Sequence, residues 1–387
     1  MLLFFIATAW LIFVLYFLYV IGKIYFTREL LTPFSKPDGL KLPFLTVIIP
    51  ARNEASNIER CVDSLLNQSY PDDRYKIIVV DDDSEDNTAA IVRKIQADHP
   101  HLNLAEAGEL PEGWTGKNNA CWKGAAIAEG EWYCFVDADT IAAPDLLGTT
   151  VAFAATHHID MLSLNPFQEL ISISERLLLP AVFISIAASM NFTRVNDPSR
   201  PEALANGQFI LFRQSVYKAM NGHSAVRGEI MDDIALAKVV KQSGYRLYWM
   251  FGDELIRTRM YQSFSDIWEG FSKNLGDIMR DDSALTSAFT AFKSLLLGWM
   301  PVMLPFLTGH GLSTGKGSML AYWTFGLSVL GTAAIFVFCL LTIKALKIPF
   351  GYVLSSPLGF TMHSLLTLNS LWNRVKGERK WKGRRYH

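Results

Sequence analysis

The sequence is poor in cysteine and almost without net charge. Its four cysteines, Cys61, Cys121, Cys134 and Cys339, show no C-x-x-C spacing, which argues against a zinc site and against a disulfide framework. We interpret them as reduced thiols in the core of a cytoplasmic unit. The formal net charge of −1 gives no reason to expect nucleic acid as a partner.

A Walker phosphate-binding loop is also absent. Gly116 and Lys117 resemble its end, but Pro111 stands where its first glycine belongs and Asn118 replaces the Ser or Thr that follows the lysine. What remains is a lysine and backbone N–H groups near the start of a predicted helix. Such a place suits a diphosphate.

Hydrophobic residues make up 50% of the chain, and the excess lies at its two ends. Leu2–Ile21 is almost wholly apolar and long enough to cross a bilayer. No positive region precedes it and no small-residue cleavage site follows, which favours a retained anchor at residues 1–30 over a secretory signal peptide. The segment Thr32–Pro43, rich in proline, is then expected to be a linker.

A second apolar region, residues 290–372, is expected near the C-terminus. Leu295–Leu307 has the composition of a span broken by Pro301 and Pro305, and Leu320–Ile343 is a clear span.

The final residues, 373–387, form a densely basic tail, which the positive-inside rule places in the cytoplasm. If the N-terminal anchor ends in the cytoplasm, two further spans return the chain there, and a third would export the tail. We therefore expect Phe350–Leu371 to be re-entrant or interfacial, hinged at Pro357. The chain is thus expected to be a multi-pass protein of the cell membrane with its central domain in the cytoplasm.

Between these regions, residues 42–285 repeat the order strand, polar tip, helix. This repetition predicts an α/β, Rossmann-like domain with a mostly parallel sheet and right-handed crossovers. The strands are expected at Phe44–Ile49, Tyr75–Val80, Leu102–Glu106, Trp132–Val136, Met161–Asn165, Phe209–Phe212 and Leu247–Phe251.

Two carboxylates, Asp137 and Asp139, directly follow the strand at Trp132–Val136. In an open α/β sheet the ligand crevice lies outside the carboxyl ends of the strands. Two carboxylates there suit Mg²⁺ or Mn²⁺, which in turn would hold phosphate oxygens. A D-x-D triplet also arises by chance in a chain of this length, so other motifs of the sequence have to show whether this one is functional.

Further aspartates stand at two other element ends. Asp81–Asp83 follows a strand, and the three carboxylates repel one another unless a cationic or donor-rich group lies beside them. The alternative is that they form an acidic turn that caps the next helix. Asp232 and Asp233 begin a predicted helix, where the macrodipole favours an ionised carboxylate. One aspartate is enough for a cap, so the second is left unexplained.

Two segments have a composition typical of helices that lie at a membrane surface. Glu175–Arg194 is predicted to be either a core helix or an interfacial helix that shapes an entrance for a lipid. Arg257, Arg259 and Lys273 alternate with aromatic residues, which suits an interfacial helix and also contact with a departing diphosphate.

Five motifs in register resemble family 2 glycosyltransferases with a GT-A fold. They are Val-Ile-Ile-Pro-Ala-Arg-Asn-Glu at 47–54, Val-Asp-Asp-Asp-Ser at 80–84, Gly-Lys-Asn-Asn-Ala at 116–120, Asp-Ala-Asp at 137–139 and Asp-Asp at 232–233. Gly-Trp-Thr-Gly-Lys at 113–117, Arg-Thr-Arg-Met-Tyr at 257–261 and the closing Trp-Lys-Gly-Arg-Arg-Tyr look most like the membrane-anchored bacterial branch that glycosylates terpenoid lipids, such as carotenoid acids, and its hopene-associated relatives.

The resemblance implies roles for individual residues. Asp82 would read the uracil of a UDP-sugar, Asp139 with Asp137 would bind the ribose and the metal, and Lys117 would face the diphosphate. The nucleotide-binding loop beside Asp82 would consist of Pro50, Ala51, Arg52 and Glu54.

Asp233 would hold the position of the catalytic base. The family often has Glu-Asp where this chain has Asp232-Asp233, so the resemblance leaves open which carboxylate does what. The chain also lacks the Gln-x-x-Arg-Trp motif of processive synthases, which favours the transfer of one sugar.

The predicted activity is an inverting, metal-dependent transfer of one sugar from a UDP-linked donor to a membrane lipid. A base would take the proton of an acceptor hydroxyl, and the metal would offset charge on the departing UDP. A carboxylic acid acceptor needs no such base, and Asp233 would then position it. The alternatives are a non-catalytic nucleotide-binding scaffold or sensor and, disfavoured by the few full spans, a polysaccharide synthase.

Overall fold

The computed structural model describes residues 1–33, 41–190, 192–278, 283–313, 318–376, 379–381 and 384–386. Most of the expected linker at Thr32–Pro43, the side chain of Lys273 and the side chains of the tail beyond residue 376 lie outside the described residues.

The chain forms two compact units, each assembled from separate stretches of sequence. The sheet unit comprises Arg28–Glu169 and Phe192–Met260. The helical unit comprises Met1–Thr27, Leu170–Asn191 and Tyr261–His387. The domain expected at 42–285 therefore contributes two segments, 170–191 and 261–285, to the helical unit.

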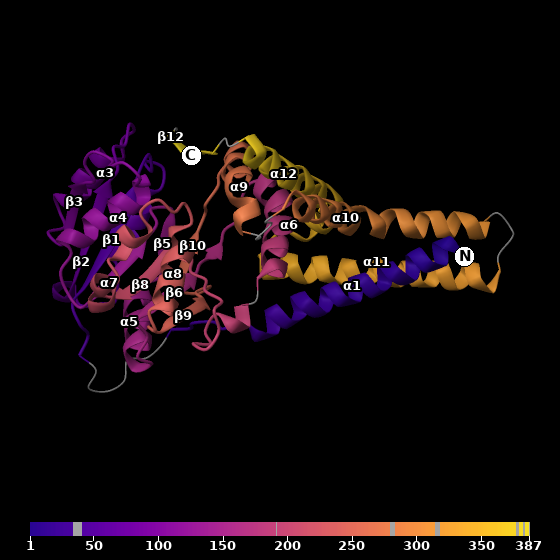
Figure 1. The fold of residues 1–387 in the computed structure, drawn as a ribbon, viewed down its shortest axis with the longest axis horizontal. Coiled ribbons are helices and arrows are strands. Elements are labelled where there is room, and N and C mark those ends of the chain that lie inside the picture. The colour runs from indigo at the N-terminus through magenta and orange to yellow at the C-terminus, as the bar shows by residue number, and fades with distance from the viewer. Residues whose placement is uncertain are drawn as a thin grey trace. The chain divides into compact units, whose positions relative to one another are not determined.

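Seven strands form the main sheet of the sheet unit, in the order β3-β2-β1-β4-β8-β6-β9 (Figure 1). β3, β2, β1 and β4 are parallel, β8 runs antiparallel to both of its neighbours, and β6 and β9 are parallel to each other. The expected mostly parallel sheet is confirmed. The strands are β1 Leu45–Ala51, β2 Tyr75–Asp81, β3 Leu102–Glu106, β4 Trp132–Val136, β6 Met161–Asn165, β8 Phe209–Arg213 and β9 Leu247–Phe251.

The strands are buried because helices cover the sheet. β4, for example, buries all five of its residues. Helix α4 approaches the sheet at Gly124, where a Cβ would lie 2.5 Å from Ile48 Cγ2 and 2.9 Å from Val80 Cγ2. The helices of this unit are α2 Ile58–Leu66, α3 Thr88–Gln96, α4 Gly116–Ile127, α5 Leu146–Thr156, α7 Gln214–Ala219 and α8 Asp232–Gln242, with 3₁₀ turns η1 Asp72–Arg74, η2 Phe192–Arg194 and η3 Gly222–Val226.

A second, three-stranded sheet consists of β5 Thr140–Ala142, β10 Ile256–Thr258 and β7 Phe167–Gln168, in that order. β5 begins directly after the Asp137–Asp139 turn. The small sheet therefore anchors that turn and brings β10, more than a hundred residues away in sequence, beside it.

Among its described residues, the helical unit contains three helices that are long and apolar enough to cross a membrane: α1 Leu2–Thr27, α10 Ala284–Ser313 and α11 Met319–Ala345. α10 is one helix through Pro301 and Pro305, so the expectation of a broken span there was wrong. The freed backbone groups of such prolines are commonly re-satisfied by neighbouring Ser or Thr hydroxyls, and Thr332 Oγ1 does donate to Pro301 O at 2.8 Å.

The rest of the helical unit consists of shorter elements that pack among these helices. Pro357 lies in the first turn of α12, a position that proline favours, rather than at a hinge between two half-helices. The interfacial placement of this segment remains a prediction. The elements are α6 Ile173–Ser189, α9 Phe264–Ile278, η4 Phe350–Val353, α12 Ser356–Lys376 and the hairpin strands β11 Arg379–Trp381 and β12 Arg384–Tyr386.

Candidate functional site

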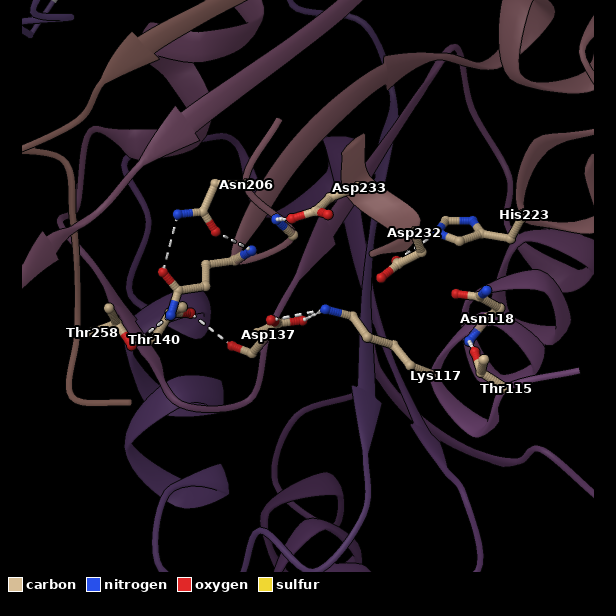
Figure 2. A network of polar contacts seen from close by, with 12 residues as sticks. Thr115, Lys117, Asn118, Asp137, Thr140, Asn206, His223, Asp232, Asp233 and Thr258 are labelled. Carbon is tan, nitrogen blue, oxygen red and sulfur yellow. Dashed lines mark hydrogen bonds and ion pairs between the residues drawn. The ribbon is translucent and has the colours of Figure 1, made fainter. Parts of the chain in front are cut away.

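The centre of the site is an ion pair between two of the predicted residues. Asp137 follows β4, and Lys117 lies in the first turn of α4. Lys117 Nζ lies 2.7 Å from Asp137 Oδ1 and donates to Oδ2 at 2.9 Å (Figure 2). Both side chains are about three-quarters buried, since their exposed fractions are 24% and 26%.

Gly207 brings Asp233 to this pair. The Gly207 N–H donates to Asp233 Oδ2 at 2.9 Å, and the Ile234 N–H donates to Oδ1 at 2.7 Å. A Cβ at Gly207 would lie 2.8 Å from Lys117 Nζ and 3.6 Å from Asp233 Oδ2. A side chain at residue 207 would therefore require the Lys117 amine to move from this position.

The charges of this cluster shift its pKa values. Burial acts to lower the pKa of Lys117, but the carboxylates of Asp137 and Asp232 outweigh it and raise that pKa well above its ordinary value. Burial, assisted by the neighbouring Asp232 charge, raises the pKa of Asp233 to about 6. The Lys117 amine thus stays charged at neutral pH, while Asp233 changes its protonation state at a pH about one unit below neutral.

Asp232 faces a different partner from Asp233. Its Oδ2 lies 3.8 Å from Nε2 of His223, whose Nδ1 shares a 2.8 Å hydrogen bond with the hydroxyl of Tyr217. Burial, together with the positive charge of Lys117, lowers the pKa of His223 to about 3, so the imidazole is neutral. The two adjacent aspartates are therefore held in separate environments, and only Asp233 contacts Gly207.

Asn118 ties the start of α4 to the loop that carries the two aspartates. Its fully buried Nδ2 group lies within hydrogen-bond distance of the carbonyls of Val226, Arg227 and Glu229, at 2.8, 3.1 and 3.0 Å. The Thr115 N–H donates to Arg227 O at 2.8 Å, and its side chain caps α4 by accepting the Asn118 N–H. One short segment thus supplies Lys117 and fixes the approach to Asp233.

A network of side-chain amides and hydroxyls, which includes Thr258 of β10, holds the Asp137–Asp139 turn in place. Thr258 Oγ1, on β10, donates to the Asp139 carbonyl at 3.3 Å and accepts from Gln208 Nε2 at 3.2 Å. Gln208 Oε1 accepts in turn from Asn206 Nδ2 at 3.3 Å. Thr140 Oγ1 donates to the Asp137 carbonyl at 2.8 Å.

The predicted nucleotide loop lies beside Asp82, as expected for adjacent strand ends. Pro50 pairs in register with Val80, and the Asp82 N–H donates to Ala51 O at 2.8 Å. Arg52 Nη1 donates to the carbonyls of Asp82 and Asp83 at 2.6 and 2.8 Å. The Asp82 side chain is buried within this turn.

The loop and the Asp137–Asp139 turn meet at Cys61. Burial raises the pKa of the Cys61 thiol to about 12, and the charges of Asp139, Glu54 and Asp137 add to the increase while a contact with Thr140 opposes it. The carboxylates of Glu54, Asp137 and Asp139, which follow two different strands, therefore lie near the same thiol.

Asp137 and Asp139 are the candidate ligands of the site for a divalent cation. Within the described ranges, no cluster of three His, Cys, Asp or Glu side chains is placed to hold a metal. Asp137 is engaged by Lys117, and Asp139 is partly exposed. Mg²⁺ is commonly held by one or two carboxylates together with substrate phosphates. A cation held in this way needs few protein ligands, and the carboxylates of this turn are of the type that it takes.

Of the basic residues predicted to meet a diphosphate, Arg257 has a carboxylate partner of its own. Arg257, exposed by 55%, lies 3.4 Å from Glu169 Oε1 rather than beside Lys117. Arg259 is partly buried, and the side chain of Lys273 lies outside the described residues.

Several residues of the site carried little or no signal in the sequence. Asn206-Gly207-Gln208 before a strand was a usable signal, because a glycine between two amides at a strand end marks a close approach. Nothing in the sequence distinguished His223. Asn118 and Thr258 lie in the motifs at 116–120 and 257–261, but their individual contacts depend on the tertiary structure.

Comparison with known proteins gives one family and two groups of similar proteins. Residues 46–220 match the model of Glycosyl transferase family 2. A 4,4'-diaponeurosporenoate glycosyltransferase of Staphylococcus haemolyticus is 26% identical over 296 residues, which cover 76% of each chain. A 4,4'-diaponeurosporenoate glycosyltransferase of Staphylococcus aureus is 29% identical over 238 residues, which cover 60% of each chain.

Two solved structures also align with the chain. The mannosyltransferase PcManGT from Pyrobaculum calidifontis, in complex with GDP-Man and Mn²⁺, is 18% identical and has a TM-score of 0.47, with 96% of this chain and 98% of that chain covered. S. aureus TarS 1-349 in complex with UDP-GlcNAc is 16% identical, with a TM-score of 0.40 and coverage of 89% and 99%.

Proposed function

We propose that this chain is a glycosyltransferase of the GT-A type, whose residues 46–220 match the family 2 model, and that it transfers one sugar from a UDP-linked donor to a terpenoid carboxylic acid in the membrane. The transfer inverts the anomeric centre and uses a divalent cation. It takes place at the cytoplasmic face of the cell membrane, in which the chain is a multi-pass protein.

The observation that carries this proposal is the convergence of Lys117, Asp137 and Asp233 around Gly207. These residues come from the ends of separate strands and helices, and structural needs alone do not require a lysine and two carboxylates at one point. A cation and adjacent carboxylates suit a diphosphate and its metal.

In the proposed complex the uracil lies against the loop at Pro50–Glu54, beside Asp82. Lys117 faces the diphosphate, and its fixed positive charge holds the leaving group in place. Asp139 would be the main ligand for the cation, and a cation held there would supply positive charge beside the departing UDP. Asp137 keeps the Lys117 amine at its position.

The nature of the acceptor decides the role of Asp233. The relatives are named for a carotenoid acid, 4,4'-diaponeurosporenoate. A carboxylic acid is already ionised near neutral pH, so its oxygen attacks the anomeric carbon without losing a proton. Asp233, with its pKa raised to about 6, then positions the acceptor in its protonated form, as a hydrogen-bond donor, rather than deprotonating it.

The test uses the full-length protein in lipid nanodiscs. UDP-glucose, UDP-GlcNAc and GDP-mannose are each offered with 4,4'-diaponeurosporenoate, with Mg²⁺, Mn²⁺ or EDTA, and products are identified by mass spectrometry. We expect one sugar to be added through an alkali-labile ester, from a UDP-linked donor, and the product to disappear with EDTA. Asp139→Asn should reduce transfer by roughly 10²-fold or more, since it removes a charged ligand at the site.

Asp145→Asn provides the matched control, because Asp145 is an exposed aspartate six residues further along the same unit. It should transfer like the unchanged protein. Donor binding without any transfer would instead support a scaffold or sensor, and long polymeric products would support a polysaccharide synthase.

A further inference from the structure

Tyr217 and His223 form a buried hydrogen-bonded pair beside Asp232. Tyr217 lies in α7 and His223 in η3, and each is only 1% exposed. The Tyr217 hydroxyl lies 2.8 Å from His223 Nδ1, and its oxygen accepts the His223 backbone N–H at 3.2 Å. All three residues belong to the sheet unit, so the geometry of the pair is that of one compact body.

The turn between Tyr217 and His223 permits this contact. Asn221 and Gly222 have positive φ values, of 59° and 44°, which turn the chain back toward α7. A Cβ at Gly222 would lie 2.1 Å from Cζ of the Tyr217 ring. Glycine at this position therefore allows His223 to reach the Tyr217 hydroxyl.

The hydrogen bonds of Tyr217 determine which ring nitrogen of His223 carries the proton. Burial raises the pKa of Tyr217 well above its ordinary value, so the hydroxyl keeps its hydrogen. Within the described part of the chain, His223 Nδ1 is the only acceptor within hydrogen-bond distance of that hydroxyl. Because Nδ1 accepts, the neutral imidazole carries its proton on Nε2.

Nε2 is the ring nitrogen that faces Asp232. It lies 3.8 Å from Asp232 Oδ2 (Figure 2), and long contacts of this kind in a free enzyme often shorten when the substrate binds. A neutral N–H group holds the carboxylate without cancelling its charge. That charge acts on Lys117, whose pKa it raises, whereas a charged imidazole would repel the Lys117 amine.

We propose that Tyr217 and His223 are positioning residues of the transfer reaction. Tyr217 fixes the tautomer of His223, and the Nε2–H of that imidazole holds Asp232 in place. Asp232 in turn keeps the Lys117 amine directed at the departing diphosphate. The inference rests on the proposed function, because the leaving group belongs to that reaction. Loss of the pair should therefore lower kcat more than it changes KM for the donor.

The first measurement determines the tautomer and needs no transfer reaction. The full-length protein, labelled with ¹⁵N-histidine, is placed in lipid nanodiscs, and the ring nitrogens are observed by NMR at neutral pH. The signals of His223 are those missing from His223→Gln. We expect the Nε2–H form in the unchanged protein and a mixture of both tautomers in Tyr217→Phe. An Nδ1–H form, or a tautomer that is the same in Tyr217→Phe, would overturn the proposal.

The second measurement is the kinetics of transfer from the UDP-linked donor. Tyr217→Phe should lower kcat about tenfold, with less than about a twofold change in KM for the donor. His223→Leu should lower kcat more than His223→Gln does, because the glutamine amide retains an N–H group near Asp232.

Tyr133→Phe is the matched control. Tyr133 is a buried tyrosine whose ring packs against that of Tyr217, but its hydroxyl donates to Ala128 O, at 3.2 Å. Both phenylalanine variants lose one hydrogen bond of a buried tyrosine, so a general loss of stability affects them alike. Tyr133→Phe should keep the kcat of the unchanged protein.

The outcomes separate this inference from the proposed function. If the unchanged protein transfers no sugar, the proposed function fails and the kinetic role of the pair fails with it, whereas NMR still decides the tautomer. If sugar is transferred, equal losses of kcat in Tyr217→Phe and Tyr133→Phe would overturn the inference. A loss confined to KM for the donor would overturn it as well.

Discussion

The backbone N–H of Gly207 donates to Asp233 Oδ2 at 2.9 Å, and the missing side chain at position 207 leaves room for the amine of Lys117. Position 207 therefore accommodates both the hydrogen bond to Asp233 and the Lys117 amine. Its role follows from contact geometry, since its φ is not in the left-handed region.

Gly207→Ala tests this directly. The new methyl group would stand 2.8 Å from Lys117 Nζ, so the amine has to withdraw from Asp137 or the strand end has to shift. We expect kcat to fall by about 10²-fold, the scale of a small misplacement of reacting groups. Gly148→Ala in α5 is the control, because nothing lies within 4 Å of its Cβ. Equal activities of the two variants would contradict the role of Gly207.

The Lys117–Asp137 pair should show coupling in a double-mutant cycle. Either Lys117→Met or Asp137→Asn leaves a largely buried charge without its partner, whereas the double variant removes both charges. We expect each single change to cost about 2 kcal/mol of unfolding free energy and the double variant to cost less than their sum, with a coupling of about 1–2 kcal/mol. Denaturant unfolding, followed by tryptophan fluorescence, measures this. Strictly additive costs would show that the pair contributes nothing.

Asn118 and its neighbour Asn119 offer a matched comparison on one helix. Both are buried, but the Asn118 amide contacts three carbonyls of the loop before Asp232, whereas the Asn119 amide donates to Ala107 O, at 3.3 Å. Asn118→Ala should therefore lower kcat by about tenfold or more while the donor affinity changes little. Asn119→Ala should leave kcat unchanged, although it costs about 1 kcal/mol of stability. The opposite order would remove Asn118 from its positioning role.

Features of the fold that are local in sequence, including which aspartates follow strands, were predicted well. Continuous apolar runs gave the strands at Met161–Asn165 and Leu247–Phe251, and the element bounds agree with the structure. The polar tips after strands likewise gave Asp82 and Asp137, because the carboxyl ends of parallel strands meet at one edge.

Features that depend on distant parts of the chain were not predicted. The strands β5 and β10 have three residues each and β7 has two, which is too short for a period of two to be visible. The antiparallel direction of β8 depends on the long connection before it. His223 lies in a 3₁₀ turn, and only the tertiary structure places it beside Asp232.

His223 should make the stability of the sheet unit depend on pH. Its pKa is lowered to about 3 in the folded chain, whereas it is about 6.5 when unfolded. The unfolded state therefore binds the proton first, and the contribution of His223 is complete above pH 6.5 and is lost as the pH falls toward 3. One such group changes the unfolding free energy by about 1.4 kcal/mol per pH unit in that window.

The measurement is the thermal midpoint of unfolding between pH 7 and 5. His223→Gln cannot take up the proton and should show a flatter decline than the unchanged protein over this range. His157→Gln is the control, since the ring of His157 is exposed. Parallel declines in all three proteins would mean that His223 does not titrate on unfolding.

Asp233 allows the acceptor class to be determined from pH dependence. Its pKa of about 6 in the free protein should appear in kcat/KM. A hydroxyl acceptor needs the ionised carboxylate as a base, so its rate should rise through pH 6. A carboxylic acid acceptor is itself an anion above pH 5, and an ionised Asp233 repels it. Its rate should therefore stay level or fall as the pH increases through 6.

The variant Asp233→Asn resembles the protonated form of Asp233. Transfer to a carboxylic acid should therefore decline by no more than about tenfold, and its pH profile should lose the inflection near pH 6. Transfer to an alcohol should decline by about 10²- to 10⁴-fold. Donor affinity measured alongside shows whether the asparagine has disturbed the contacts to Gly207 and Ile234. With donor affinity intact, loss of acid transfer by more than about 10²-fold in Asp233→Asn would mean that Asp233 works as a base and that the true acceptor presents a hydroxyl group.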